Sequence, residues 1–141
     1  MGLRSFIHRL TAPPMVANGV EIPKGEVKLV CIVNHGIKMG KGKIAAQVGH
    51  AAVKAALAAA EHHPNLMQAW LSSGQQKVVV KAVDAAEIEK LVNAARRSAL
   101  PACTINDAGR TQIPAGTLTV GAIGPAEAEE INQLTGHLKL L

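Results

Sequence analysis

Aromatic side chains are almost absent from this sequence. Of its 141 residues only Phe6 and Trp70 are aromatic, and there is no tyrosine. Domains that read single-stranded RNA on an RRM sheet or an OB-fold barrel stack the bases on several exposed aromatic rings. The sequence therefore excludes this kind of base recognition, and any bound RNA would be held through phosphate contacts and shape.

Cysteines and long apolar runs are also scarce. The two cysteines, Cys31 and Cys103, lie inside apolar segments, and two thiols cannot supply the four ligands of a closed zinc site. We expect them to be buried free thiols, which fits a protein of the reducing cytoplasm. No apolar run approaches the length of about 18 residues that a membrane span requires. The sequence thus predicts a cytoplasmic protein without a membrane segment, a metal or another cofactor.

Acidic residues are missing from a long stretch of the chain. Between residues 27 and 60 there are five lysines and no aspartate or glutamate, although the whole chain has 15 basic and 10 acidic residues. The net charge is +5 and the isoelectric point is near 9.5. Such a field favours a polyanionic partner, with nucleic acid as the first candidate.

The first 25 residues differ from the rest of the chain. Proline, asparagine and glycine recur between Pro13 and Gly25, and no hydrophobic period is sustained. We expect residues 1–25 to form a flexible extension of a single domain that spans residues 26–141. The extension has basic residues and no acid before Glu21, which makes it weakly similar to an organelle transit peptide.

Strand and helix patterns alternate along residues 27–141. Strands are expected where apolar residues run together, at residues 27–33, 77–83, 101–106 and 118–124. Helices are expected at residues 43–62, 65–71 and 84–98, and a last helix is expected to begin at Pro125 and to end before Gly136. This order predicts an α/β domain whose sheet is covered on both faces. The sheet should be mostly parallel but mixed, because the last two strands are close enough for an antiparallel pair.

The loop at residues 35–42, before the first long helix, is rich in glycine and lysine. A G-x-x-x-x-G-K-[ST] phosphate loop is excluded, because Ile37 and Ile44 stand where that pattern needs a glycine and a hydroxyl. A basic loop at a helix N-terminus remains a fair anion site. A solvated turn explains the same loop equally well.

Four polar residues recur along that helix at spacings of 4, 3 and 4, namely Lys43, Gln47, His50 and Lys54. At about 100° per residue they fall within an arc of roughly 40°. The stripe is either the solvated side of an amphipathic helix or a functional surface. Exposed helix faces usually pair acids with bases, and this helix has no acid before Glu61, which favours a functional surface.

A third feature is the segment Asp107-Ala-Gly-Arg-Thr-Gln-Ile113, which directly follows a predicted strand. Open α/β sheets bind ligands at the carboxyl ends of their strands. Asp107 is suited to hold a lysine or to orient water, and Thr111 supplies a hydroxyl. An Asx-type turn is the commoner role of such a segment.

Together these segments resemble the type 2 peptidyl-tRNA hydrolase family of archaea and eukaryotes. The resemblance covers residues 27–141 and rests on KMGKGKIAAQ (38–47) followed by HAA (50–52), on DAGRTQI (107–113), on AIGP (122–125) and on TGHLKLL (135–141). It implies a three-layer α/β/α domain with a mixed sheet of about four strands, usually as a homodimer. It also implies an esterase that cleaves peptides from tRNA and so returns free tRNA to translation.

The resemblance implies a catalytic group at Lys43, Asp107 and Thr111, with Gln47, His50 and Gln112 lining or supporting the site. Basic residues suited to tRNA phosphates are Lys38, Lys41, Lys54 and Arg110. As a hypothesis, Lys43 stabilises the oxyanion, and Asp107 orients Lys43 or acts as a base toward water. Thr111 then positions that water or is itself the nucleophile.

The segment after the first predicted strand departs from the family pattern. Relatives typically have an arginine and an aspartate just after the first strand, where this chain reads Asn34-His35-Gly36.

Two other functions are alternatives to the enzyme. A non-catalytic RNA-binding module would use the same basic face and would tolerate loss of Asp107. A protein-interaction module would use residues 1–25. The enzyme is the favoured interpretation.

Overall fold

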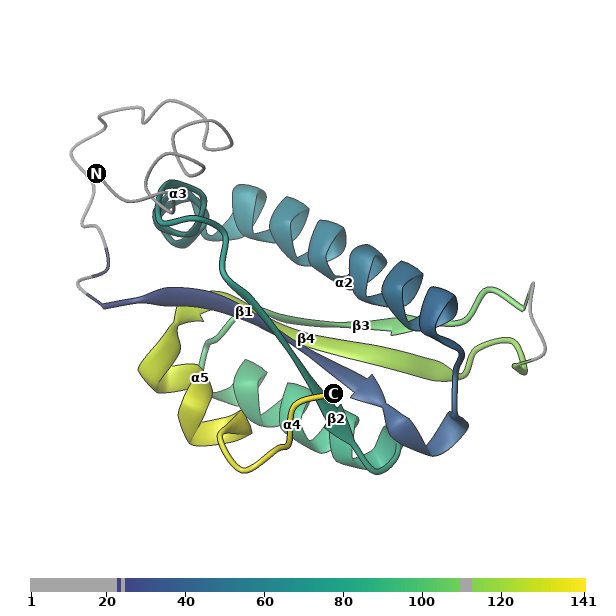
Figure 1. Cartoon of the computed structure of the whole chain (residues 1–141). Helices are drawn as coiled ribbons and strands as arrows, with labels where there is room; N and C mark the ends of the chain where they lie inside the picture. The colour runs from purple at the N-terminus through teal and green to yellow at the C-terminus, as the bar shows by residue number, and fades with distance from the viewer. Residues whose placement is uncertain (1–22, 24, 110–112) are drawn as a thin grey trace.

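The computed structural model describes residue 23, residues 25–109 and residues 113–141. The predicted extension at residues 1–25 therefore lies almost wholly outside the described residues, as do Arg110, Thr111 and Gln112. The elements in chain order are β1 (Val27–Asn34), the short 3-10 helix η1 (His35–Ile37), α2 (Lys41–His62), α3 (Pro64–Ser72), β2 (Lys77–Ala82), α4 (Ala85–Arg97), β3 (Ala102–Asn106), β4 (Leu118–Glu127) and α5 (Ala128–Thr135). Figure 1 shows their arrangement around the central sheet.

The sheet is mixed, as the sequence predicts, and its strand order is β2-β1-β4-β3. β1 pairs with β2 in parallel, whereas β4 is antiparallel to both β1 and β3. The expectation of a mostly parallel sheet is therefore wrong for the pairings of the described strands. Residues 107–117 connect β3 to β4, and this segment is shorter than the dozen or more residues that a parallel crossover needs.

The predicted helix start at Pro125 is also wrong, because Pro125 lies inside β4 and α5 begins at Ala128. β4 extends this far because β1 continues to offer partners, with Lys28 opposite Ala126 and Val27 opposite Glu127. The register of this pair shifts between Lys28 and Val30. A shift of this kind accommodates a proline, which has no N–H to donate to a neighbouring strand.

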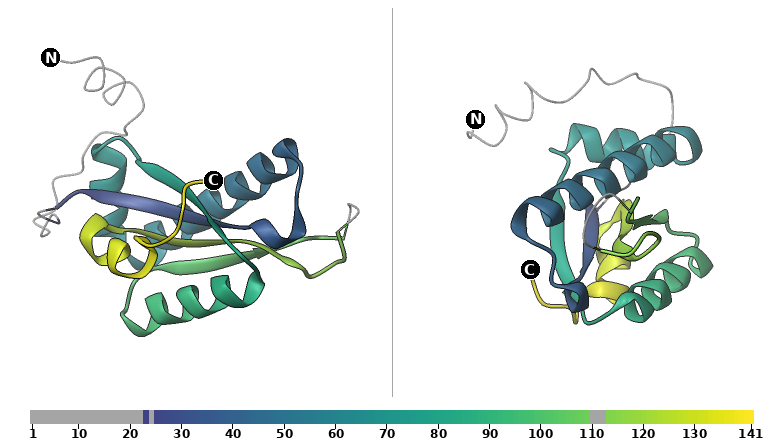
Figure 2. Two further views of the ribbon diagram at one scale, coloured as in Figure 1. Left: turned by 60° about the horizontal axis from the view of Figure 1, so that its bottom comes forward. Right: turned by 90° about the vertical axis from the view of Figure 1, so that its right-hand side faces the viewer.

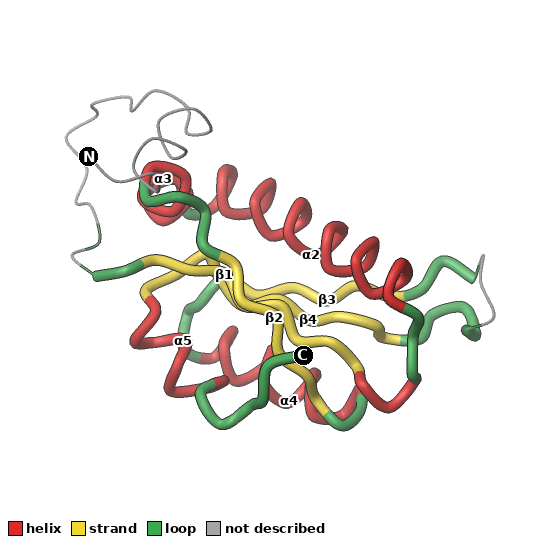
Figure 3. Tube along the Cα trace, in the orientation of Figure 1, coloured by secondary structure: helices red, strands yellow, loops and turns green. Residues whose placement is uncertain are grey.

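Helices cover both faces of the sheet, which confirms the three-layer α/β/α arrangement (Figures 2 and 3). On one face, Ala51 and Ala55 of α2 and Trp70 of α3 pack with Leu29, Cys31 and Val33 of β1. On the other face, Ile88 and Val92 of α4 and Ile131 of α5 pack with Val30 and Ile32. Successive β1 residues thus point to opposite layers, as the side-chain alternation of a strand requires.

The two cysteines are free and buried, as predicted. Both lie opposite Ala122, one on each side of β4. Two strand spacings separate them by about 9.6 Å, which is beyond the Cα separation of a disulfide. Burial raises the pKa of the Cys31 thiol to about 12 and also raises the pKa of the Cys103 thiol. Both groups are therefore neutral, unreactive packing residues at physiological pH.

The two edges of the sheet are covered differently. At the β2 edge the C-terminal segment runs alongside the strand, because Lys81 N–H donates to the Lys139 carbonyl and Leu141 N–H donates to the Val79 carbonyl. β3 forms the opposite edge, and among the described residues no strand pairs with its outer side. One edge of the sheet is thus occupied by the chain itself and the other is open.

None of the helices formed by residues 25–109 and 113–141 combines the length and the apolar character that crossing a bilayer requires.

Candidate active site

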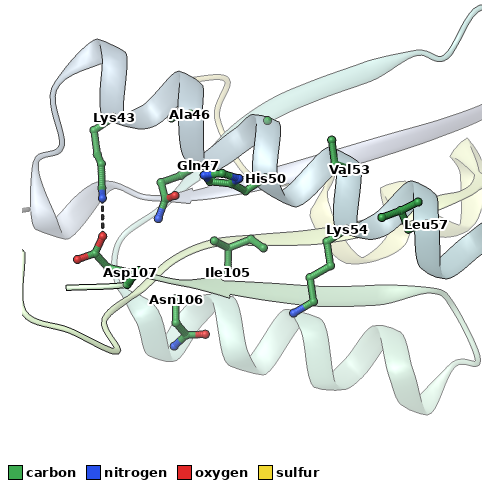
Figure 4. Close-up of a pocket in the computed structure, with 12 residues that line it drawn as sticks. Lys43, Ala46, Gln47, His50, Val53, Lys54, Leu57, Ile105, Asn106 and Asp107 are labelled. Carbon is green, nitrogen blue, oxygen red and sulfur yellow. Dashed lines mark hydrogen bonds and ion pairs between the residues drawn. The ribbon is translucent and has the colours of Figure 1, made fainter. Parts of the chain in front are cut away.

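An ion pair joins the first turn of α2 to the end of β3. The Lys43 ammonium donates to a carboxylate oxygen of Asp107 (Figure 4). The Lys43 side chain is 22% exposed, whereas the Asp107 side chain is 2% exposed. A cation in the first turn of a helix is opposed by the helix dipole, and the buried carboxylate compensates for this. The pair therefore fixes an ammonium group at the protein surface in one position.

The backbone at Asp107 is held on the β4 side. Its N–H donates to the Thr117 carbonyl, and its carbonyl accepts from Gly116 N–H. The second carboxylate oxygen of Asp107 accepts from Gly109 N–H at 3.1 Å, which is the predicted Asx-type turn. Gly109 has a φ of +80°, a conformation that favours glycine. The turn and the ion pair thus use different oxygens of one carboxylate, so the predicted turn and the predicted contact with a lysine are both present, whereas a catalytic role of this segment stays a prediction.

One turn further along α2, Gln47 is buried beneath the groove. Its amide nitrogen donates to the Thr119 hydroxyl at 2.8 Å, and that hydroxyl donates to the Ile105 carbonyl at 3.1 Å. This chain of hydrogen bonds locks Gln47 to the two strands under it. Thr119 is a site residue that the sequence analysis missed, and the only signal for it is a hydroxyl inside the apolar run of β4.

The polar stripe of α2 faces an open groove between this helix and β3, with a volume of about 980 Å³. The groove is lined by residues of both elements and of the turn after β3: Lys43, Ala46, Gln47, Gly49, His50, Val53, Lys54, Leu57, Ile105, Asn106, Asp107 and Ala108. Figure 4 shows the stripe side chains above β3. All four predicted stripe residues line the groove, and their role in binding or catalysis stays a prediction.

The basic residues divide into two places. Lys38 and Lys41 are exposed, at the end of η1 and at the first residue of α2. Lys54 lies about 20 Å further along α2, and its ammonium donates to the Thr104 carbonyl at 3.0 Å. The structure therefore does not bring Lys54 together with Lys38 and Lys41. Arg110 lies outside the described residues, together with the candidate catalytic and supporting residues Thr111 and Gln112.

The segment that departs from the family has a structural role of its own. Asn34 is buried, and its amide donates to the Leu118 carbonyl at 2.9 Å. Its side-chain oxygen accepts from Gly36 N–H at 3.1 Å and so caps η1. A β-carbon at Gly36 would lie 2.6 Å from the Val83 carbonyl oxygen. Asn34 and Gly36 thus build the turn that leads to α2, whereas His35 is exposed.

Within the described part of the chain, no group of three or more histidine, cysteine, aspartate or glutamate side chains could hold a metal ion. The expected absence of a metal and of another cofactor stays a prediction. Among the described residues, the groove offers the ammonium groups of Lys43 and Lys54, the buried carboxylate of Asp107, the anchored amides of Gln47 and Asn106 and the exposed imidazole of His50.

Comparison with known proteins identifies the family of this chain. The family described as Peptidyl-tRNA hydrolase PTH2 matches residues 27–141. The chain is 47% identical to "Peptidyl-tRNA hydrolase" of Methanocaldococcus jannaschii, over 82% of this chain and 100% of that protein. It is 48% identical to "Probable peptidyl-tRNA hydrolase 2" of Drosophila melanogaster, over 81% of this chain and 61% of that protein. It is 47% identical to "Peptidyl-tRNA hydrolase 2, mitochondrial" of Homo sapiens, over 82% of this chain and 65% of that protein. The resemblance seen in the sequence is thereby confirmed, and the chain belongs to the Peptidyl-tRNA hydrolase PTH2 family.

Proposed function

We propose that this protein hydrolyses the ester bond between a peptide, or an N-acylated amino acid, and the terminal ribose of tRNA. The observation that carries the proposal is the Lys43–Asp107 ion pair at one end of a groove, beside an exposed basic loop. The names of the relatives support the same activity. The comparisons give no support to a non-catalytic RNA-binding or protein-interaction module.

In this mechanism a water oxygen attacks the ester carbonyl carbon, and negative charge develops on the carbonyl oxygen. The Lys43 ammonium meets that charge, and its contact with Asp107 supports a positioning role for the carboxylate. The bond to the ribose oxygen then breaks, that oxygen takes one proton of the attacking water, and the peptide leaves as a carboxylate while the second proton of the water passes to solvent. Thr111 positions this water. In the alternative, the Thr111 hydroxyl attacks the ester first and its proton passes to the ribose oxygen, and water then hydrolyses the acyl-threonine ester. Gln47, His50 and Gln112 support the site in both cases.

The direct test measures release of free tRNA from N-acetyl-aminoacyl-tRNA by the purified protein. Hydrolysis is expected for the N-acetylated substrate, because its acyl group reproduces the amide that follows the ester in peptidyl-tRNA. An intact, folded protein that releases no tRNA from this substrate would refute the proposed function. That result would direct attention to the segment Asn34-His35-Gly36.

We propose that tRNA phosphates are bound by Lys38 and Lys41, together with Arg110. With about three phosphate contacts, binding of a non-hydrolysable peptidyl-tRNA analogue should weaken about 20- to 40-fold between 50 and 200 mM salt. Lys41→Ala should reduce the slope of log Kd against log salt by about one, whereas Lys90→Ala, on the opposite face, should not change it. Affinity that does not depend on salt would contradict the phosphate-binding role.

We further propose that the protein works as a homodimer in the cytoplasm and that residues 1–25 are an extension outside the catalytic domain. The exposed apolar side chains of Val83 and Leu140, both at the β2 edge, support a contact between copies there.

The relatives from Bos taurus and Homo sapiens are named as mitochondrial. The alternative to a cytoplasmic location is therefore an organelle, with residues 1–25 as the targeting segment.

A further inference from the structure

The outer edge of β3 is an open hydrogen-bonding surface. The Thr104 carbonyl accepts from the Lys54 ammonium, so it points away from β4. Asp107 instead bonds toward the β4 side through both its N–H and its carbonyl. Because peptide groups alternate between the two sides of a strand, the backbone groups of Ala102, Thr104 and Asn106 face outward. Among the described residues no strand pairs with them.

This open edge borders the apolar half of the groove. Val53 and Leu57 of α2 are 60% and 68% exposed, and both line the groove together with Ile105. The same groove continues to Lys43 and Asp107 (Figure 4). Exposed apolar side chains are poor partners for phosphate, so the two ends of the groove suit different parts of one substrate.

We propose that the peptide part of peptidyl-tRNA lies in this groove and adds to β3 as a fifth strand; this inference rests on the proposed function. The ester must be at Lys43 and Asp107, beside the carboxyl end of β3. The peptide is esterified through its own C-terminus and runs back from this point, so it lies parallel to β3. Its backbone pairs with the strand edge, and its side chains contact Val53, Leu57 and Ile105. Recognition through the backbone accepts any peptide sequence.

The structure also explains how this edge is protected when no peptide is bound. Lys54 donates to the Thr104 carbonyl, which is the acceptor that an added strand would use. Lys54 belongs to α2, but its ammonium lies at the edge of β3, and a charge at a strand edge discourages pairing with other chains. When a peptide binds, its N–H donates to the Thr104 carbonyl, and the long, exposed side chain of Lys54 moves away from that carbonyl.

The length of β3 sets the length of the peptide that is recognised. β3 has five residues, which corresponds to about 17 Å of extended chain. Contacts should therefore accumulate over roughly the first five peptide residues from the ester and then stop. A gain of two net backbone hydrogen bonds corresponds to a KM about tenfold lower than that of a single acylated residue.

The experiment measures KM and kcat for N-acetylated peptidyl-tRNAs whose peptides contain one to eight residues. KM is expected to fall about tenfold with length and to level off near five residues. In the five-residue substrate, N-methyl groups at alternate positions should abolish the gain, because only every second peptide N–H faces β3. N-methyl groups at the intervening positions should leave it unchanged, which distinguishes strand pairing from apolar contact alone.

Variants test the same groove from the side of the protein. In Val53→Asp and Leu57→Asp the ratio of KM between the shortest and longest substrates should fall toward one. Both side chains are largely exposed, so these changes should not unfold the protein. Ala58→Asp is the matched control, because it places the same charge on an exposed α2 position that does not line the groove. It should keep the wild-type ratio.

The outcomes separate the inference from the function on which it rests. An active wild-type protein whose KM does not change with peptide length overturns the strand-addition proposal alone. An N-methyl scan without alternation, or a wild-type ratio in Val53→Asp and Leu57→Asp, overturns it as well. A wild-type protein that hydrolyses no member of the series overturns the proposed function and this inference with it.

Discussion

Lys43→Ala is expected to lower kcat for peptidyl-tRNA hydrolysis by about 10²- to 10³-fold, which is the usual loss for one oxyanion donor. The reason is that the Lys43 ammonium is the charged donor that Asp107 holds at the end of the groove. The N-terminal turn of α2 still offers backbone N–H groups and a dipole in the variant, so a residual rate should remain. Single-turnover release of tRNA at saturating enzyme measures this loss without a contribution from binding.

Two controls make the result specific to the position of Lys43. Lys90→Ala removes an exposed lysine from α4, on the opposite face of the sheet, and should keep the wild-type kcat. Lys43→Ala should destabilise the fold by about 1–3 kcal/mol, because one donor to a buried carboxylate is lost. A typical domain remains folded after such a loss. A folded Lys43→Ala protein with a wild-type kcat would exclude Lys43 from the chemistry.

The sequence was sufficient to predict the elements that have a strong local signal. The apolar run of β1 and the alanine-rich α2 are found where they were expected, within two residues at each end. α4 begins where the helix at residues 84–98 was expected, and the Asp84 carboxylate caps it by accepting from Glu87 N–H at 2.9 Å. The Glu87 side chain bonds to Val83 N–H instead of to the cap residue itself. Local hydrogen bonds of this kind depend on residues a few positions apart, so the sequence displays them directly.

Features that depend on pairing between distant segments could not be predicted in the same way. The extent of β4 is decided by Val27 and Lys28, which lie about a hundred positions earlier in the chain. The position of β4 between β1 and β3 likewise depends on which edge of β1 it takes. No local pattern at residues 118–127 carries this information, and Pro125 locally favours a helix start.

The site shows the same division between local and distant information. Lys43 and Asp107 could be named because each stands at an element end that commonly binds ligands. Their contact across the sequence is a product of the fold. The exposure of Val53 and Leu57 could not be predicted, because α2 is apolar on several sides. The sheet takes the alanine side of the helix, through Ala51 and Ala55, since small side chains allow close packing.

Asp107→Asn is the second substitution for which a large loss is expected, about 10²-fold in kcat. Asparagine has the same shape and keeps an oxygen for Gly109 N–H, so the turn after β3 should survive. What is lost is the negative charge that holds the Lys43 ammonium. The variant is compared with wild type by release of tRNA from N-acetyl-aminoacyl-tRNA, with thermal unfolding as the check on folding. A wild-type rate in Asp107→Asn would remove the ion pair from the mechanism.

The double variant Lys43→Ala/Asp107→Asn decides between two roles for Asp107. If the carboxylate acts by positioning Lys43, it has nothing to position once Lys43 is gone, and the double variant should be no slower than Lys43→Ala alone. If the carboxylate is a base toward water, the two losses should multiply and the acidic limb of the pH–rate profile should vanish in Asp107→Asn. The contact between the ammonium and the carboxylate favours the first result, in which Asp107 contributes to catalysis only through Lys43.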